Sequence, residues 1–308
     1  MPLNIFGFQA LWSPYLFVFT LLVFAIYLLV TIKWRDRFED SQPLSKKELS
    51  AFLIGLVLFY AVKGSPIDLI GHILFSVHMV QMALLLMLIP PLLIVGIPTW
   101  VWNKLLTFSF ISKVFRFFTK PLLALIVFSG LFSIYHIPIM LDTIKLNEWY
   151  HSLFTLILFM SAIFLWWPIM NKLNDEHQVH GLKKIGYIVG SAILITPACA
   201  LIIFASEPMY ATYSNGDAWL KAMELCVPTD TMSTLASSGL SGPELFTNMP
   251  AVEDQQLGGV IMKIIQEIIY GVLLAIIFFQ WYKNEQDNAE EITQQALADR
   301  QTSLNSNQ

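Results

Sequence analysis

Residues 70–90 read IGHILFSVHMVQMALLLMLIP, an apolar stretch without any Asp, Glu, Lys or Arg. A helix needs about 20 such residues to cross the hydrocarbon core of a bilayer. The stretch therefore predicts a membrane-spanning helix. Outward from it, six more stretches predict the same, at about 14–32, 49–62, 121–137, 151–170, 185–205 and 257–282.

The composition of the whole chain agrees with several spans. Of its 308 residues, 56% are hydrophobic and 13% are charged, with a net charge of −4, whereas soluble domains carry about 25% charged residues. This excludes a soluble enzyme and a disordered chain, and the lack of a basic patch excludes a nucleic-acid partner. We predict an all-α integral membrane protein with seven transmembrane helices, a multi-pass protein of the cell membrane.

Lys and Arg are distributed unevenly between the loops, and this bias predicts the orientation. Fourteen of the 18 lie in the loops at 33–48, 96–120 and 171–184 and in the C-terminal tail, against three in the alternate loops. The N-terminus is therefore expected outside and the C-terminus in the cytoplasm. The first span lacks a positive region before it, so we expect a retained helix and not a cleaved signal peptide.

Two regions outside the spans are large enough to describe. The longest loop, about 206–256, is predicted to be extracytoplasmic, and Trp219, Met223 and Cys226 recur in it at the spacing of an interfacial helix. The chain divides into a seven-helix transmembrane domain, 1–283, and a polar cytoplasmic tail, 284–308, which we expect to be disordered.

Histidines and methionines gather on the predicted outer side. Four histidines lie at or near the outer ends of spans three to five: His72, His78, His136 and His151. On one continuous helix, His72 and His78 would share a face about 120° wide with Met79 and Met82. Polar side chains in a bilayer normally face the bundle interior, so we expect this face to point inward.

Imidazole and thioether together form a ligand set that suits Cu(I), whereas zinc more often takes carboxylates or several thiolates. Met262, in the last span, is placed at about the depth of His72. The predicted core copper ligands are His78, Met79 and Met82. His72 together with His136 or His151 completes the shell, and Met262 is a further candidate. The competing interpretation is that the histidines hydrogen-bond across helices and the methionines fill gaps.

The last span carries an intramembrane Lys263 and Glu267 at i, i+4, which predicts an ion pair or, alternatively, a proton or ion relay. Gly258 and Gly259 in the same span permit close helix approach. No nucleophile elbow, P-loop or zinc-protease motif is present, so we predict no enzyme. We expect structural or surface roles for the remaining cysteines and histidines: Cys199, Cys226, His177 and His180.

Four segments, in this order and spacing, resemble the multi-span CtaG family of cytochrome c oxidase assembly factors. They are His72 through Met82 to Pro90-Pro91, Tyr135-His136-Ile137-Pro138, His151 through Trp166-Trp167-Pro168, and Asp254-Gln255-Gln256-Leu257-Gly258-Gly259 through Met262. The resemblance extends from the first span to Lys283. It implies a role in the maturation of a caa-type oxidase at its copper centres, with oxidase subunits and membrane lipid as partners. Met82 stands where many relatives have a second histidine.

The ligand set and the resemblance favour a non-enzymatic assembly factor that binds Cu(I) at the outer face and delivers it to a haem-copper oxidase. One alternative is a copper transporter or copper-resistance protein, which would need polar residues to continue into the inner halves of the spans. Another is a b-type haem protein, in which His78 with His136 or His151 would bind the iron.

Overall fold

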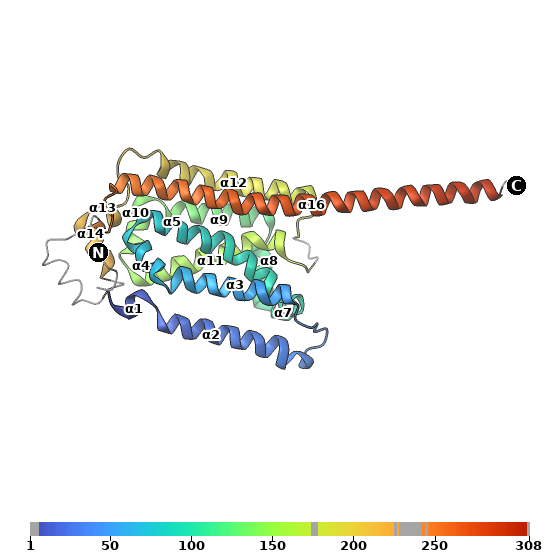
Figure 1. Cartoon of the computed structure of the whole chain (residues 1–308), viewed down its shortest axis with the longest axis horizontal. Helices are drawn as coiled ribbons and strands as arrows, with labels where there is room; N and C mark the ends of the chain where they lie inside the picture. Colours follow the sequence, from blue (N-terminus) through green and yellow to red (C-terminus); the bar gives the residue numbers. More distant parts are fainter. Residues whose placement is uncertain (1–5, 174–177, 225–226, 228–241, 244–245, 307–308) are drawn as a thin grey trace.

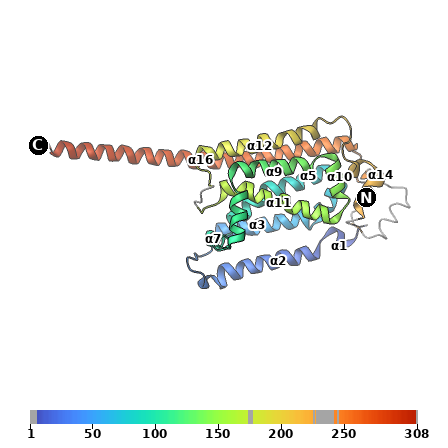
Figure 2. The same ribbon diagram turned by 180° about the vertical axis from the view of Figure 1, so that it is seen from behind.

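The computed structural model describes residues 6–173, 178–224, 227, 242–243 and 246–306, and in these ranges it is helical without strands. The long helices run side by side, with α1 and α14 at one end and the end of α16 far beyond the other (Figure 1, Figure 2). In chain order the helices are α1 (Gly7–Leu11), α2 (Pro14–Leu28), α3 (Lys46–Lys63), α4 (Pro66–Ile73), α5 (Phe75–Ala83), α6 (Ile89–Gly96), α7 (Thr99–Leu105), α8 (Ser109–Phe118), α9 (Pro121–Tyr135), α10 (Pro138–Lys145), α11 (Glu148–Met170), α12 (Leu182–Ile203), α13 (Ala211–Ser214), α14 (Gly216–Met223) and α16 (Ala251–Ser306).

Five helices of the described residues are long and apolar enough to cross a membrane: Pro14–Lys33, Phe75–Gly96, Glu148–Met170, Leu182–Ile203 and Ala251–Ala296. Two bent pairs meet the same standard when joined, α3 with α4 at 45° and α8 with α9 at 78°. The all-α membrane fold is thus confirmed, with five to seven candidate spans; the expected seven corresponds to counting each bent pair as one. The side of the membrane that each terminus faces stays a prediction.

The third span differs from its prediction because the chain breaks at Leu74, which has an extended backbone (φ −117°, ψ 130°). Asp254 of α16 caps the new helix: its carboxylate accepts a hydrogen bond from the Phe75 amide at 2.7 Å and further bonds from the amide and hydroxyl of Ser76. His72 therefore belongs to α4 and His78 to α5. The predicted single helix face that carries both was wrong.

The same span does not end at Pro90 and Pro91. From α5 it continues through a π-helical segment, Leu84–Leu88, into α6, which ends at Gly96. Both prolines lie in the first turn of α6, where a missing N–H group and the fixed φ of proline are tolerated.

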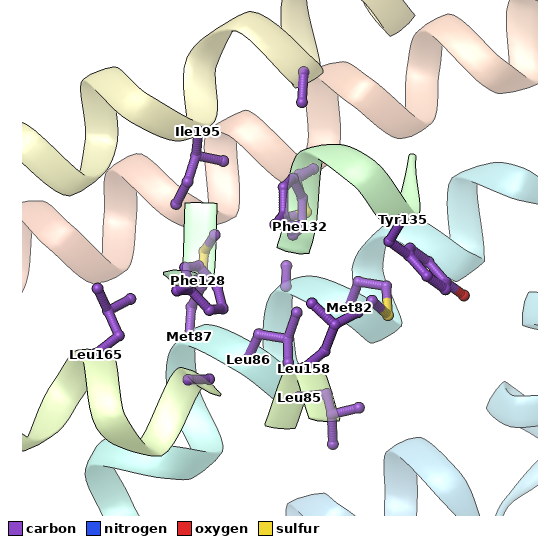
Figure 3. Close-up of a cluster of buried hydrophobic side chains, with 14 of the residues drawn as sticks. Met82, Leu85, Leu86, Met87, Phe128, Phe132, Tyr135, Leu158, Leu165 and Ile195 are labelled. Atoms are coloured by element: carbon purple, nitrogen blue, oxygen red, sulfur yellow. The ribbon is translucent and has the colours of Figure 1, made fainter. Parts of the chain in front are cut away.

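The centre of the bundle is filled by large apolar side chains from several helices (Figure 3). Phe128 and Phe132 of α9 are fully buried in one cluster with Leu86 and Leu158. Trp166 of α11 adds an interhelical hydrogen bond from its indole N–H to the carbonyl oxygen of Leu86 at 3.0 Å. Packing and such bonds hold membrane helices together, because lipid tails are as apolar as the core.

Gly96 lies where α6 approaches α3 most closely. A Cβ atom there would lie 2.5 Å from the Phe52 amide nitrogen and 2.7 Å from its Cα. We expect Gly96→Ala to lower the free energy of unfolding by about 1–3 kcal/mol, the typical effect of overpacking, measured by thermal unfolding in detergent. Gly130→Ala, where a Cβ would meet nothing within 4 Å, is the matched control. Equal losses in the two variants would contradict this explanation.

The helix predicted around Trp219 and Met223 is present as α14, but its apolar face does not rest on lipid. Trp219 and Met223 are fully buried in a second cluster with Leu69 and Ile73 of α4. The apolar stripe is therefore explained by packing on the end of the bundle. Cys226, the last residue of the predicted stripe, lies outside the described residues.

Helix α8 lies across the bundle and combines an apolar with a basic side. Phe110 is 79% and Phe117 is 53% exposed, while Phe115 is buried, and Lys113 and Arg116 are exposed. Such a helix is typical of the membrane–water interface.

At the C-terminal end of the chain, α16 extends as one helix through Ser306 (Figure 1), whereas we expected residues 284–308 to be disordered.

Candidate metal site

Four helices bring one histidine each to the same end of the bundle. His72 lies in the last turn of α4, His78 in α5, His136 directly after α9 and His151 in the first turn of α11. Helix α11 begins here because the side chain of Asn147 caps it by accepting a hydrogen bond from the Tyr150 amide at 3.1 Å.

The four imidazoles are arranged as two pairs. The ring centroids of His72 and His151 are 5.1 Å apart, and those of His78 and His136 are 6.3 Å apart. His72, His78 and His136 are buried, which confirms that they do not face lipid. In the described residues, no three His, Cys, Asp or Glu side chains are grouped closely enough to hold one metal ion, so the site is not a ready-made centre of such ligands.

Three buried ring nitrogens lack a hydrogen-bond partner within the described part of the chain: His72 Nδ1, His78 Nε2 and His136 Nε2. For His136 the other nitrogen, Nδ1, lies 2.8 Å from the carbonyl oxygen of Phe132. Nδ1 must therefore carry the proton, which leaves the Nε2 lone pair free. Buried polar atoms normally have partners, and a neutral imidazole nitrogen without one is a potential metal ligand.

Lys145 and Tyr213 lie between the two pairs. The Lys145 ammonium is 3.5 Å from the centre of the Tyr213 ring and donates to the carbonyl oxygen of His72 at 3.2 Å. Tyr213 lies with its ring centroid 6.1 Å from that of His78. Burial raises the pKa of the Tyr213 hydroxyl, so it stays protonated and donates to the carbonyl oxygen of Gly71 at 2.9 Å.

The turn that carries Tyr213 is fixed by one carboxylate. Asp142 of α10 accepts hydrogen bonds from the amides of Ala211 and Thr212, both at 3.0 Å, and from the Thr212 hydroxyl at 2.7 Å. Tyr210 of the same turn donates to the carbonyl oxygen of His136 at 2.9 Å. The turn at α13 is therefore held on α10 and contacts the segments that carry His72 and His136.

A polar clamp ties α3, α4 and α5 together near the same end. Asp68 pairs with Lys63 at 2.6 Å and accepts a hydrogen bond from the Gln81 amide group at 2.5 Å. The same Gln81 nitrogen also donates to the carbonyl oxygen of Val62 at 2.7 Å. The clamp fixes α5, and with it His78, relative to α4.

The predicted methionine ligands are all buried in the main hydrophobic cluster of the bundle. Met79 lies at the seam with α16, since a Cβ atom at Gly258 would come within 3.1 Å of its side chain. Met262 is fully buried one turn beyond Gly258. Met82 is buried in the cluster that also contains Tyr135 (Figure 3), and the Tyr135 ring lies 5.9 Å from that of His78.

The other predicted residues have the following places. Cys199 is buried with a free thiol, and His180 is exposed, whereas His177 lies outside the described residues.

A cavity of about 670 Å³, lined by Arg37, Trp100 and Lys104 among others, lies at the bundle end opposite the histidines. Lys145, Tyr213 and Asp142 were not predicted from the sequence as parts of the site.

Fold and site together define a helical membrane protein that gathers four histidines at one end of the bundle. Within that class, the chain belongs to the cytochrome c oxidase caa3 assembly factor (Caa3_CtaG) family, whose pattern matches residues 25–284. This confirms the resemblance found in the sequence.

More distant similarity links the chain to mycobacterial proteins described as uncharacterized. It is 23% identical over 276 residues to the proteins Mb0105 of Mycobacterium bovis and MT0111 of Mycobacterium tuberculosis, covering 84% of this chain and 37% of each of them. It is 24% identical over 252 residues to ML1998 of Mycobacterium leprae, covering 77% and 34%. The chain thus spans little more than a third of these relatives. No solved structure matches it.

Proposed function

We propose that this protein promotes the assembly of a caa3-type cytochrome c oxidase by holding Cu(I) among its buried histidines and methionines and passing it to the oxidase. The proposal rests mainly on one observation: three buried imidazole nitrogens from three helices have no hydrogen-bond partner in the described chain. Neutral imidazoles and thioethers are soft ligands that suit Cu(I). The protein would act without catalysis, in the cell membrane and in contact with oxidase subunits and lipid.

The arrangement in two pairs fits a carrier. Cu(I) accepts few ligands, so one imidazole pair with a neighbouring thioether is enough to hold it. The second imidazole pair is then a position to which the ion can move on its way to the oxidase. The pairs His72–His151 and His78–His136 are joined by the buried Lys145 and Tyr213.

The test is an anaerobic Cu(I) titration of the purified full chain against a chromogenic chelator. We expect the wild type to bind copper, and His78→Ala to lose binding by at least about tenfold, the effect of removing one of few ligands. His180→Ala, which alters an exposed histidine, is the matched control. Wild-type protein that takes up no copper would refute the proposal, and a Soret band in its absorption spectrum would favour the haem alternative.

In cells, the same variants should separate the assembly role from general damage. His78→Ala is expected to lower oxidase activity while the amount of the variant in the membrane stays normal, and His180→Ala is expected to leave activity unchanged. Normal oxidase activity with His78→Ala would contradict the assignment of His78 as a copper ligand.

A further inference from the structure

An ion pair lies on the outside of the last helix. Lys263 and Glu267 of α16 pair at 2.8 Å, and their side chains are 28% and 59% exposed. Lys263 also donates to the hydroxyl of Thr196 in α12 at 3.0 Å. Within the described part of the chain, Lys263 is the one side chain that pairs with Glu267.

This ion pair lies at the middle of the membrane-spanning part of α16. Glu267 is 16 residues after Ala251, where α16 begins, and 16 residues before Lys283. At 1.5 Å per residue, about 24 Å of helix separates it from either point. The partner of Lys263, Thr196, is likewise an internal residue of α12 (Leu182–Ile203), so apolar turns flank the pair on both helices.

The surroundings of Glu267 form one continuous surface, which we call the outer face of α16. At 100° per residue, its members fall within an arc of about 100°: Val260, Ile264, Glu267, Ile268 and Gly271. Val260, Ile264 and Ile268 are 39%, 53% and 61% exposed, and a Cβ at Gly271 would meet nothing within 4 Å. Gln266, on the other side of the helix, is fully buried.

Exposure of a carboxylate at this depth is unfavourable in lipid. Ionisable side chains within a bilayer nearly always face protein or a water-filled cavity, because hydrocarbon offers them no hydrogen bonds. Lys263 provides one charged partner for the Glu267 carboxylate, but a carboxylate can accept several more hydrogen bonds. The face that carries it is therefore suited to contact with another protein helix, and the missing side chain at Gly271 permits close approach.

We propose that the outer face of α16 docks a transmembrane helix of the oxidase under assembly, which donates a hydrogen bond from a polar or basic side chain to Glu267. This inference rests on the proposed function, since it names the contact through which that function reaches its client. A second copy of the chain fits less well: a two-fold axis along the membrane normal would bring two Glu267 carboxylates to the same depth, where they repel each other.

The test places a photocross-linking amino acid, p-benzoylphenylalanine, at Ile268 of the full chain, in membranes of cells that produce the oxidase with tagged subunits. The matched control carries it at Ile126 of α9, which is 55% exposed. We expect an adduct with a tagged oxidase subunit from position 268 and none from 126. Adducts only with lipid, only with a second copy, or equally from both positions would overturn the proposal.

Two substitutions then test the chemistry of the contact. Glu267→Gln should reduce the oxidase adduct by about fivefold, the typical worth of one interhelical hydrogen bond in a membrane. Gly271→Leu should reduce it at least as much by preventing close approach, while Gly130→Leu, on an equally open position of α9, should not. Because a Cβ atom added at Gly271 would meet nothing within 4 Å, that variant is expected to fold normally.

The outcome can be separated from failure of the proposed function. If deletion of the whole protein leaves the oxidase intact, the proposed function fails. If deletion abolishes the oxidase but Glu267→Gln and Gly271→Leu retain full adduct and full oxidase activity, only the docking inference fails. Cu(I) binding by both purified variants should stay at the wild-type level, since neither Glu267 nor Gly271 is among the proposed copper ligands.

Discussion

Replacing Lys145 with methionine is expected to lower the free energy of unfolding by about 1–3 kcal/mol. Lys145 is 1% exposed, and its ammonium group donates to the carbonyl oxygen of His72 at 3.2 Å. Methionine keeps most of the apolar stem but cannot donate, so this buried carbonyl oxygen loses a hydrogen bond. The measurement is thermal unfolding in detergent.

Lys145→Arg is the matched control, because it keeps N–H donors and a positive charge at the same place, so its loss of stability should be smaller. Lys145→Met is also expected to weaken Cu(I) binding in the chelator competition, because the contact of Lys145 with the carbonyl oxygen of His72 is lost. A Lys145→Met variant that unfolds at the wild-type temperature and binds Cu(I) as the wild type does would contradict this role of Lys145.

Asp254→Ala is expected to have the largest effect on stability. Its carboxylate accepts three hydrogen bonds at the start of α5, from two amides and a hydroxyl, and Asp254 is buried. Leaving buried donors without partners costs about 1–3 kcal/mol each, so we expect a loss of about 3 kcal/mol or more in thermal unfolding. His78 lies one turn into α5, and Cu(I) binding should weaken with it.

Asp254→Asn provides the graded comparison. The amide keeps one acceptor oxygen in nearly the same shape, so roughly half of the loss is expected. If both variants unfold at the wild-type temperature, the hydrogen bonds of Asp254 do not hold the break at Leu74, and the separation of α4 from α5 needs another cause.

The spans could be predicted from the sequence because their signal is local. An uncharged run such as 70–90 shows its length and hydropathy without reference to the rest of the chain, and the structure has membrane-length helices or bent pairs at every predicted place. The paired Lys263 and Glu267 were predicted for the same reason, as residues one helical turn apart.

The break at Leu74 could not be predicted in this way. The carboxylate that stabilises it belongs to Asp254, 179 residues after Phe75. A helical wheel drawn through 72–82 assumes one axis, and the bend places His72 on another helix. Because the contact with Asp254 separates α4 from α5, His72 lies next to His151 and not next to His78.

The burial of Lys145 could not be predicted from the sequence either. In the sequence this residue is one of the few basic residues on the predicted outer side and resembles a solvated loop charge. Its burial depends on the Tyr213 ring, which approaches from a turn 68 residues later. No periodicity in either segment indicates the contact, because α10 and α13 are short and a few residues give no reliable helical pattern.

The hydrogen bonds that fasten the α13 turn have a kinetic consequence. Three of them end on the single carboxylate of Asp142, and the imidazoles of His72, His78 and His136 are buried, so an ion exchanged past this turn would have to wait until these bonds open. The affinity of the ligands would then determine how much metal is carried, whereas the rate at which the turn opens would determine how long each ion stays bound.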